Sequence, residues 1–285
     1  MKIGVSSYSF SRYMATTGAD YFEICKIAKS IGFEAIEFIN LNVESSEDER
    51  ASRLELARRL KKYCDELGIE IVAYTVGADL VNKNPDESFD ELVHCLDVAL
   101  CLGAKILRHD VAYKLIDGMT YKDVIRIAAP QIREITKEAQ VRGIRTSVEN
   151  HGWIIQAPEI VEELIREVNH PNFGWLCDIG NFLCADCDPL ASVRIAAKYT
   201  LHAHAKDFYF KPASELPAEG FRIPTNGGNS LKGTVVGNGV VPVKECIDVL
   251  RDAGYDGVLS LEFEGTEDPI EAIKTGYERL KEYIS

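Results

Sequence analysis

Short apolar runs alternate with longer helix-period segments along the whole chain, and this alternation constrains the fold more than any other feature. The short runs are rich in β-branched residues, which favour strands. Several of the longer segments stop at a glycine, which is typical of the left-handed end of a helix. We predict strands over 3–7, 35–39, 69–75, 105–108, 144–149, 173–178, 199–205 and 257–262, and helices over 21–31, 46–67, 85–102, 121–141, 158–168, 189–198 and 269–283.

Strands that alternate with helices form parallel sheets, because each helix carries the chain back to the start of the next strand. Eight such units is the number that closes into a (β/α)8 TIM barrel. We therefore predict the α/β class, with a single barrel domain that spans residues 1–285. An open, doubly wound sheet is the alternative, but no glycine-rich GxGxxG turn follows the first predicted strand.

Composition and charge exclude several classes of function. Lysine and arginine number 32 against 45 aspartates and glutamates, and the resulting net charge of −13 disfavours general binding to nucleic acid. No apolar run approaches the roughly 18 residues of a membrane span, and the first residues lack the apolar core of a signal peptide. We expect a cytoplasmic protein with no nucleic-acid or membrane partner.

One segment, 208–242, breaks the alternation because it is rich in Gly, Pro, Asn and Ser and has no helix period. It follows the seventh predicted strand, so it lies on the C-terminal face, where barrels carry their active sites. We predict that it forms a lid or side wall of the active site, with Lys232 as its substrate contact. The alternative is a loop that contacts another copy of the chain.

Four consecutive predicted strands, the fifth to the eighth, end in the polar residues Glu149, Asp178, His204 and Glu262. Neighbouring strands lie about 4.8 Å apart, so these side chains can converge. Three clustered carboxylates repel one another, and a divalent cation relieves that repulsion. Three oxygens and one imidazole suit Mn²⁺, Mg²⁺ or Co²⁺ better than structural zinc. A carboxylate alone at a strand end is more often a helix cap or an ion pair, and a histidine alone is more often a core residue. Because four such residues occur together, we predict one mononuclear metal site.

Other polar residues near the same strand ends are candidate substrate contacts. His151 has the same strand parity as Glu149, and Lys206 has the parity of His204, where it can stabilise an oxyanion or a phosphate. Glu37 lies at the end of the second predicted strand, and Arg108 and His109 lie at the end of the fourth, where they can hold substrate hydroxyl groups. Structural ion pairs, or a solvent-facing ring for His151, are the alternatives. The basic residues of 208–242 are dispersed, which favours a substrate without phosphate.

Five motifs stand at or near the last four strand ends. They read SVENH at the fifth strand, CDIGN at the sixth, HAHAKD at the seventh, GNG at 237–239 and GYDGVLSLE at the eighth. With these motifs the chain resembles the xylose isomerase-like barrel superfamily of sugar isomerases and epimerases. That group includes tagatose 3-epimerase-type enzymes, hydroxypyruvate isomerase, inosose dehydratase and, more distantly, endonuclease IV.

The resemblance implies that Glu149, Asp178, His204 and Glu262 are the metal ligands, and that Glu149 and Glu262 are also the catalytic acid and base. Glu264 is the fallback ligand. It further implies a divalent-metal-dependent isomerase or epimerase that acts on a keto-sugar or keto-polyol by proton abstraction through an enediolate. The expected cofactor is one divalent ion, Mn²⁺ first, with Mg²⁺ or Co²⁺ possible and Zn²⁺ disfavoured.

The sequence also departs from the family pattern. Asn181 stands where many family epimerases have a histidine, and Phe210 lies near the place of a substrate-facing arginine. The extra histidines of the endonuclease branch are missing apart from His109, so DNA repair is disfavoured. One alternative therefore stays open: a metal-dependent lyase or dehydratase on keto-sugars or keto-glycosides, similar to C-glycoside deglycosidases with a small partner subunit. Another is a barrel module without catalysis. We expect a small carbohydrate substrate and a homo-oligomer.

Overall fold

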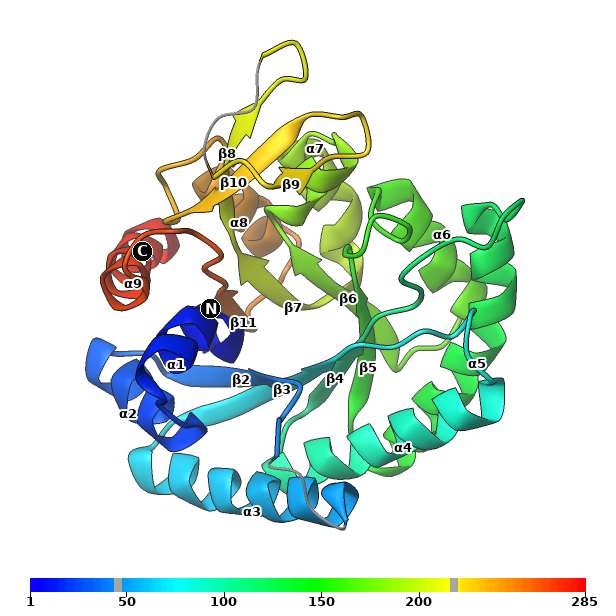
Figure 1. The fold of residues 1–285 in the computed structure, drawn as a ribbon, viewed down its shortest axis with the longest axis horizontal. Coiled ribbons are helices and arrows are strands. Elements are labelled where there is room, and N and C mark those ends of the chain that lie inside the picture. Colours follow the sequence, from blue (N-terminus) through cyan, green and yellow to red (C-terminus); the bar gives the residue numbers. More distant parts are fainter. Residues whose placement is uncertain (44–47, 216–219) are drawn as a thin grey trace.

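The computed structural model describes residues 1–43, 48–215 and 220–285. Eight parallel strands close into a ring in the order β1-β11-β7-β6-β5-β4-β3-β2, which confirms the predicted (β/α)8 barrel. Figure 1 shows the helices around the outside of this ring. The barrel strands are β1 (Lys2–Ser6), β2 (Ala35–Ile39), β3 (Glu70–Val76), β4 (Ile106–His109), β5 (Arg145–Glu149), β6 (Phe173–Asp178), β7 (Thr200–Ala205) and β11 (Val258–Leu261).

The helices follow the predicted pattern closely, because each carries a regular apolar stripe that packs on the ring. Two helices, α1 and α8, were not predicted. The predicted start of the helix at 46 lies outside the described residues. The helices are α1 (Ser11–Thr17), α2 (Tyr21–Ile31), α3 (Glu49–Leu67), α4 (Pro85–Leu102), α5 (Tyr121–Val141), α6 (Pro158–Val168), α7 (Pro189–Ala196), α8 (Val243–Asp252) and α9 (Pro269–Ile284). None of these is long and apolar enough to cross a membrane.

The inside of the barrel changes from apolar to polar along the strands. Near the N-terminal ends a buried apolar layer fills the ring, and it consists of Ala35, Val72, Ala73, Ile106 and Val258. Because side chains alternate along a strand, the next inward positions lie two residues further on. They hold Glu37 in β2, Arg108 in β4 and Ser260 in β11, all buried. The polar part of the interior therefore lies directly below the C-terminal face.

The segment after β7 is a small antiparallel sheet. It contains β8 (Asp207–Lys211), β9 (Ile223–Pro224) and β10 (Ser230–Thr234), in the order β8-β10-β9. Figure 1 shows it at the rim of the barrel. The sequence predicted an irregular segment here, whereas the structure contains three strands. These strands were missed because the pairing between β8 and β10 joins residues far apart in the chain and leaves no local period.

One buried carboxylate joins the two ends of the inserted segment. Asp207 accepts hydrogen bonds from the backbone N–H groups of Phe208, Gly237, Gly239 and Val241, at 2.8 to 3.1 Å. A Cβ on Gly239 would overlap Oδ1 of Asp207, so this close approach requires glycine. The HAHAKD and GNG motifs are therefore two halves of one contact.

Candidate active site and metal centre

Four side chains converge at the C-terminal face, from four neighbouring positions in the ring. Glu149 ends β5, Asp178 ends β6, His204 lies in β7, and Glu262 directly follows β11. One donor atom from each lies within 4.8 Å of the donor atoms of the others. All four residues are buried. The structure thus brings together the four residues that were predicted as metal ligands.

The polar atoms in this cluster fit a cation. Oδ1 of Asp178 accepts hydrogen bonds from the backbone N–H groups of Gly180 and Asn181, at 2.8 and 2.9 Å. Oδ2 of Asp178 and Nδ1 of His204 are buried without a hydrogen-bond partner and lie 3.6 Å apart. Oε2 of Glu262 is also 3.6 Å from that Nδ1. Buried polar atoms need partners, and one divalent cation between these donors would satisfy them together.

Lys206 places an ammonium group beside this cluster. Its Nζ lies 2.5 Å from Oε2 of Glu262, 3.2 Å from Oε2 of Glu264 and 3.5 Å from Oδ2 of Asp178. Burial opposes the charge of this group, but the carboxylates outweigh burial and raise the pKa of Lys206 well above its usual value. Burial likewise acts to raise the pKa of Glu262, yet Lys206 and His204 lower it well below the usual range.

Glu149 is held on both of its oxygens. Oε2 lies 2.9 Å from Nε of Arg108, and Oε1 accepts a 2.9 Å hydrogen bond from Nδ2 of Asn181. Burial raises the pKa of Glu149, although Arg108 acts in the opposite direction. Arg108 also donates to Asp110 at 2.6 Å, and Asp110 lies 2.9 Å from Nδ1 of His151. A continuous polar chain therefore runs from the cluster to His151.

A cavity of about 280 Å³ opens above the cluster. Of the predicted site residues, Glu149, His151, Lys206 and Glu262 line it. The other lining residues are Tyr8, Ile39, Asn40, Gly77, Arg108, Asp110, Tyr113, Gly152, Trp153, Gln156, Asn181, Cys184, Phe208, Ile223 and Glu264.

The inserted sheet closes one side of this cavity. Phe208 of β8 and Ile223 of β9 line it. Nε1 of Trp153 donates a 3.1 Å hydrogen bond to the carbonyl of Pro224, and Nδ2 of Asn226 donates to the carbonyl of Trp153 at 3.3 Å. The sheet is thus attached to the loop after β5. In the part of 208–242 that the structure describes, the segment is a side wall.

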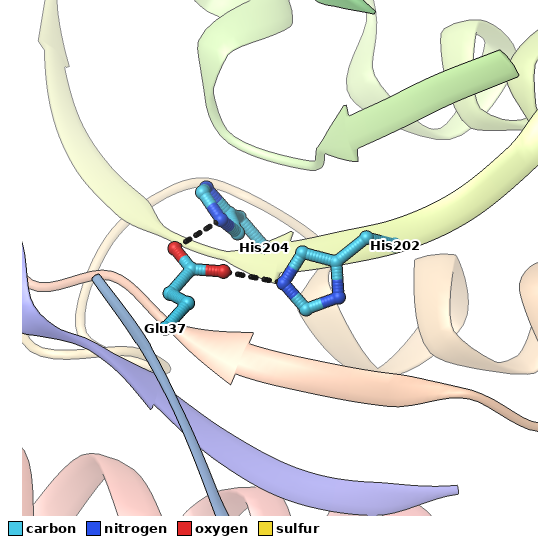
Figure 2. Close-up of side chains that lie close together, drawn as sticks. All are labelled: Glu37, His202 and His204. Carbon is cyan, nitrogen blue, oxygen red and sulfur yellow. Dashed lines mark hydrogen bonds and ion pairs between the residues drawn. The ribbon is translucent and has the colours of Figure 1, made fainter. Parts of the chain in front are cut away.

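Glu37 does not line the cavity, in contrast to the prediction that it holds a substrate hydroxyl. Figure 2 shows its carboxylate between two imidazole rings. Oε1 lies 2.7 Å from Nε2 of His204, and Oε2 lies 2.5 Å from Nε2 of His202. Burial acts to raise the pKa of Glu37, but the two histidines outweigh burial and lower it. The side chain of Glu37 is fully buried, and the ring of His204 lies between it and the four converging residues.

Two other predicted substrate contacts also lie outside the cavity lining. The ring of His109 is fully buried, stacks on Phe173 and has Nδ1 2.8 Å from the carbonyl oxygen of Asp110. The neighbouring Arg108 points inward instead. Lys232 and Leu231 point to opposite faces of β10. It is Leu231 that packs against Phe208, a residue of the cavity wall.

Sequence reasoning missed Asp110 and Asn40 as site candidates, and it named Arg108 only together with His109, without deciding which of the two faces the cavity. Arg108 and Asp110 flank His109, so the alternation of side chains along β4 is the signal that could have found them. Asn181 was noted only as a departure from the family pattern. In the structure it contacts Glu149 through Nδ2 and accepts a 3.3 Å hydrogen bond from Lys206.

Residues 25–283 match the family model described as xylose isomerase-like TIM barrel. The chain belongs to this family. Among curated relatives of this xylose isomerase-like barrel, inosose dehydratase of Glaesserella parasuis serovar 5 is 27% identical over 225 residues, which are 74% of each chain. L-ribulose-5-phosphate 3-epimerase UlaE of Escherichia coli is 24% identical over 271 residues, or 88% of this chain and 86% of the epimerase.

Solved structures share the fold of this xylose isomerase-like barrel. The IOLI protein with a bound zinc atom superposes with a TM-score of 0.75 at 17% identity, over 100% of this chain and 98% of that one. A xylose isomerase-like TIM barrel protein from Mycobacterium smegmatis in complex with magnesium gives a TM-score of 0.74 at 18% identity, over 99% and 96% of the two chains. At these identities the likeness concerns the fold.

Proposed function

We propose that this barrel is a divalent-metal-dependent enzyme that isomerises or epimerises a small keto-sugar or keto-polyol. The observation that carries the proposal is the convergence of Glu149, Asp178, His204 and Glu262 below a cavity. Such a set of three carboxylates and one imidazole suits a catalytic cation. The named activities of the two curated relatives, an epimerase and a dehydratase of carbohydrates, support the same class of chemistry.

Glu149, Asp178, His204 and Glu262 would hold the metal ion. A bound divalent cation supplies Lewis acidity, which polarises a substrate carbonyl and acidifies the hydrogen on the adjacent carbon. Mn²⁺ remains our first candidate, with Mg²⁺ or Co²⁺ next. The zinc and magnesium named for the two structural neighbours make both ions necessary members of any metal panel.

The two glutamates supply the proton transfers in this proposal. Glu149 and Glu262 stand on β5 and after β11, the outer two of the four strands that carry the cluster. They therefore flank the place where the reacting carbon binds. One removes the proton to give an enediolate, and the other returns a proton to the opposite face. Lys206 beside Glu262 stabilises the negative charge on the enediolate oxygen, and His151 binds a hydroxyl group.

We propose a substrate without phosphate, because both buried cations of the cavity wall already have partners. Arg108 contacts Glu149 and Asp110, and Lys206 contacts Glu262 and Glu264. A phosphate dianion in this cavity would face these four carboxylates, and like charges placed together cost several kcal/mol.

A free ketose should therefore be a better substrate than its phosphate ester. We expect kcat/KM to be about 100-fold higher for the free sugar, equivalent to roughly 2.7 kcal/mol. Paired assays of ketoses and their phosphates measure this ratio directly. A higher kcat/KM for the phosphate ester would contradict this proposal. It would indicate that Arg108 or Lys206 leaves its carboxylate partner and binds the phosphate.

A dehydratase is the second candidate, and the relative named inosose dehydratase favours it. The first step is the same removal of a carbon-bound proton. The outcomes differ in whether the enediolate is protonated or loses a neighbouring hydroxyl group. A lyase on keto-glycosides, with a small partner subunit, would lose an aglycone at that point instead.

The proposal is tested by metal analysis joined to an exchange assay. Protein purified without added metal is analysed for bound ions, stripped with chelator and reloaded with each metal of the panel. We expect about one ion per chain, and exchange of a substrate hydrogen with D₂O that chelator abolishes and metal restores. Keto-sugars and inososes form the substrate panel, and product analysis separates epimer, dehydrated product and free aglycone. A protein with no bound metal and no response to chelator would be a barrel without catalysis.

A further inference from the structure

A buried carboxylate lies on the far side of His204 from the cavity. Glu37 reaches into the barrel from β2, which is separated from β7 in the ring by β1 and β11. Its two oxygens are divided between Nε2 of His204, at 2.7 Å, and Nε2 of His202, at 2.5 Å (Figure 2). Glu37 and His202 have no exposed surface, and His204 is 1% exposed. Glu37 therefore has no substrate to meet, and its contacts are with the two rings.

Nε2 of His204 faces Glu37, and Nδ1 of the same ring faces the cluster. A neutral imidazole carries its proton on one nitrogen and offers the lone pair of the other. With Nε2 held against Glu37, the nitrogen left for a cation is Nδ1, which is the one 3.6 Å from both Asp178 and Glu262. Carboxylates placed in this way fix the ring orientation and the basicity of a metal-binding histidine.

His202 holds the second oxygen of the same carboxylate. Its Nε2 is also 3.2 Å from Oγ of Ser260 on β11. Because His202 holds Oε2 of Glu37 by a hydrogen bond, Oε1 stays directed toward His204. His202 is not one of the four converging residues, so its contribution to the cluster passes through Glu37.

We propose that Glu37 is a positioning residue that selects Nδ1 of His204 as a metal donor, and that His202 keeps Glu37 in place. This inference rests on the proposed metal site. It assigns a role in metal affinity to two residues that touch neither the cavity nor the other three ligands.

Metal affinity tests the inference more directly than activity does. The metal-free wild type, Glu37→Gln and His202→Asn are titrated with Mn²⁺ and with Co²⁺. We expect Glu37→Gln to bind Mn²⁺ about 10- to 100-fold more weakly, with a changed visible spectrum of bound Co²⁺, because the ring of His204 is no longer fixed. His202→Asn keeps the contact between Glu37 and His204, so we expect a smaller loss, about 3- to 10-fold.

Thr146→Val is the matched control, since it also removes a buried polar contact in the barrel by a change of similar shape. Thr146 lies on β5 and shares a 2.7 Å hydrogen bond with Thr136, away from the cluster. We expect it to lower the unfolding temperature while the Mn²⁺ affinity and the Co²⁺ spectrum stay as in the wild type.

The outcomes separate this inference from the proposed function. If the wild type binds neither ion, the proposed function fails and the inference fails with it. If the wild type binds metal and Glu37→Gln binds it equally well with the same Co²⁺ spectrum, Glu37 is only a structural ion pair. If Glu37→Gln does not fold, unchanged affinity in His202→Asn overturns the inference in the same way.

Discussion

Replacing Glu149 with glutamine should lower kcat about 1,000-fold, while the protein keeps its fold. The amide preserves the shape of the side chain but cannot accept a proton from carbon, and a positioned acid or base contributes roughly 100- to 10,000-fold to a rate. The hydrogen bond between Oε1 and Asn181 can persist, whereas Arg108 loses a charged partner. The measurement is the exchange of the substrate hydrogen with D₂O, followed by NMR at saturating metal.

Glu264→Gln is the matched control for this experiment. Glu264 lines the same cavity and lies 3.2 Å from Lys206, but it is not one of the four converging residues. We expect less than about a 10-fold loss in kcat, because only a charge near the site changes. Normal exchange in Glu149→Gln would exclude Glu149 as the base, and an equal loss in both variants would point to charge rather than proton transfer.

The second large effect is expected on stability. Asp207→Ala removes the acceptor of four backbone N–H groups, those of Phe208, Gly237, Gly239 and Val241. Hydrogen bonds to a charged group contribute about 1.5–3 kcal/mol each, and a buried donor without a partner carries a further penalty. Because some of these donors can reach water, we expect the free energy of unfolding to fall by about 3–5 kcal/mol in urea titrations.

Asp186→Ala gives the comparison for this variant. Asp186 also accepts hydrogen bonds from the inserted segment, from the N–H of Gly227 and from Nδ2 of Asn229, but these contacts are exposed. We expect a loss of about 1 kcal/mol. The Asp207 variant should also lose substrate affinity, since Phe208 of the wall follows directly in the chain. Equal losses in the free energy of unfolding would show that burial of the acceptor does not increase its contribution to stability.

The fold and the convergence of the four polar strand ends were predictable because they depend on local signals. Each barrel strand was located to within one residue, since an apolar run bounded by a glycine is visible in a short window. Once eight strands are taken to close, four consecutive strand ends must meet at one face. The convergence of Glu149, Asp178, His204 and Glu262 therefore follows from the order of the strands, whereas their role as metal ligands was implied by the family resemblance and stays a prediction.

The positions of the remaining site residues depend on strand pairing and register, which a short stretch of sequence does not reveal. The fourth strand was predicted at 105–108 and is Ile106–His109, and it is so short that its inward-facing positions were not decided by its pattern. Arg108 faces the cavity, and His109 faces the helices. Glu37 was placed on the correct inward side of β2, but its depth is set by the pairing with β3, whose register shifts between Ile36 and Glu37.

The floor and the wall of the cavity come from separable parts of the chain. The charged floor is built from strand ends inside the closed ring, whereas Phe208 and Ile223 belong to the inserted sheet. Asp207 joins the two ends of the inserted segment, and Trp153 attaches the sheet to the loop after β5. Residues between these two attachments can vary without moving a charge below them. A barrel organised in this way can acquire new substrates in evolution through its insertion, while the reaction itself is inherited unchanged.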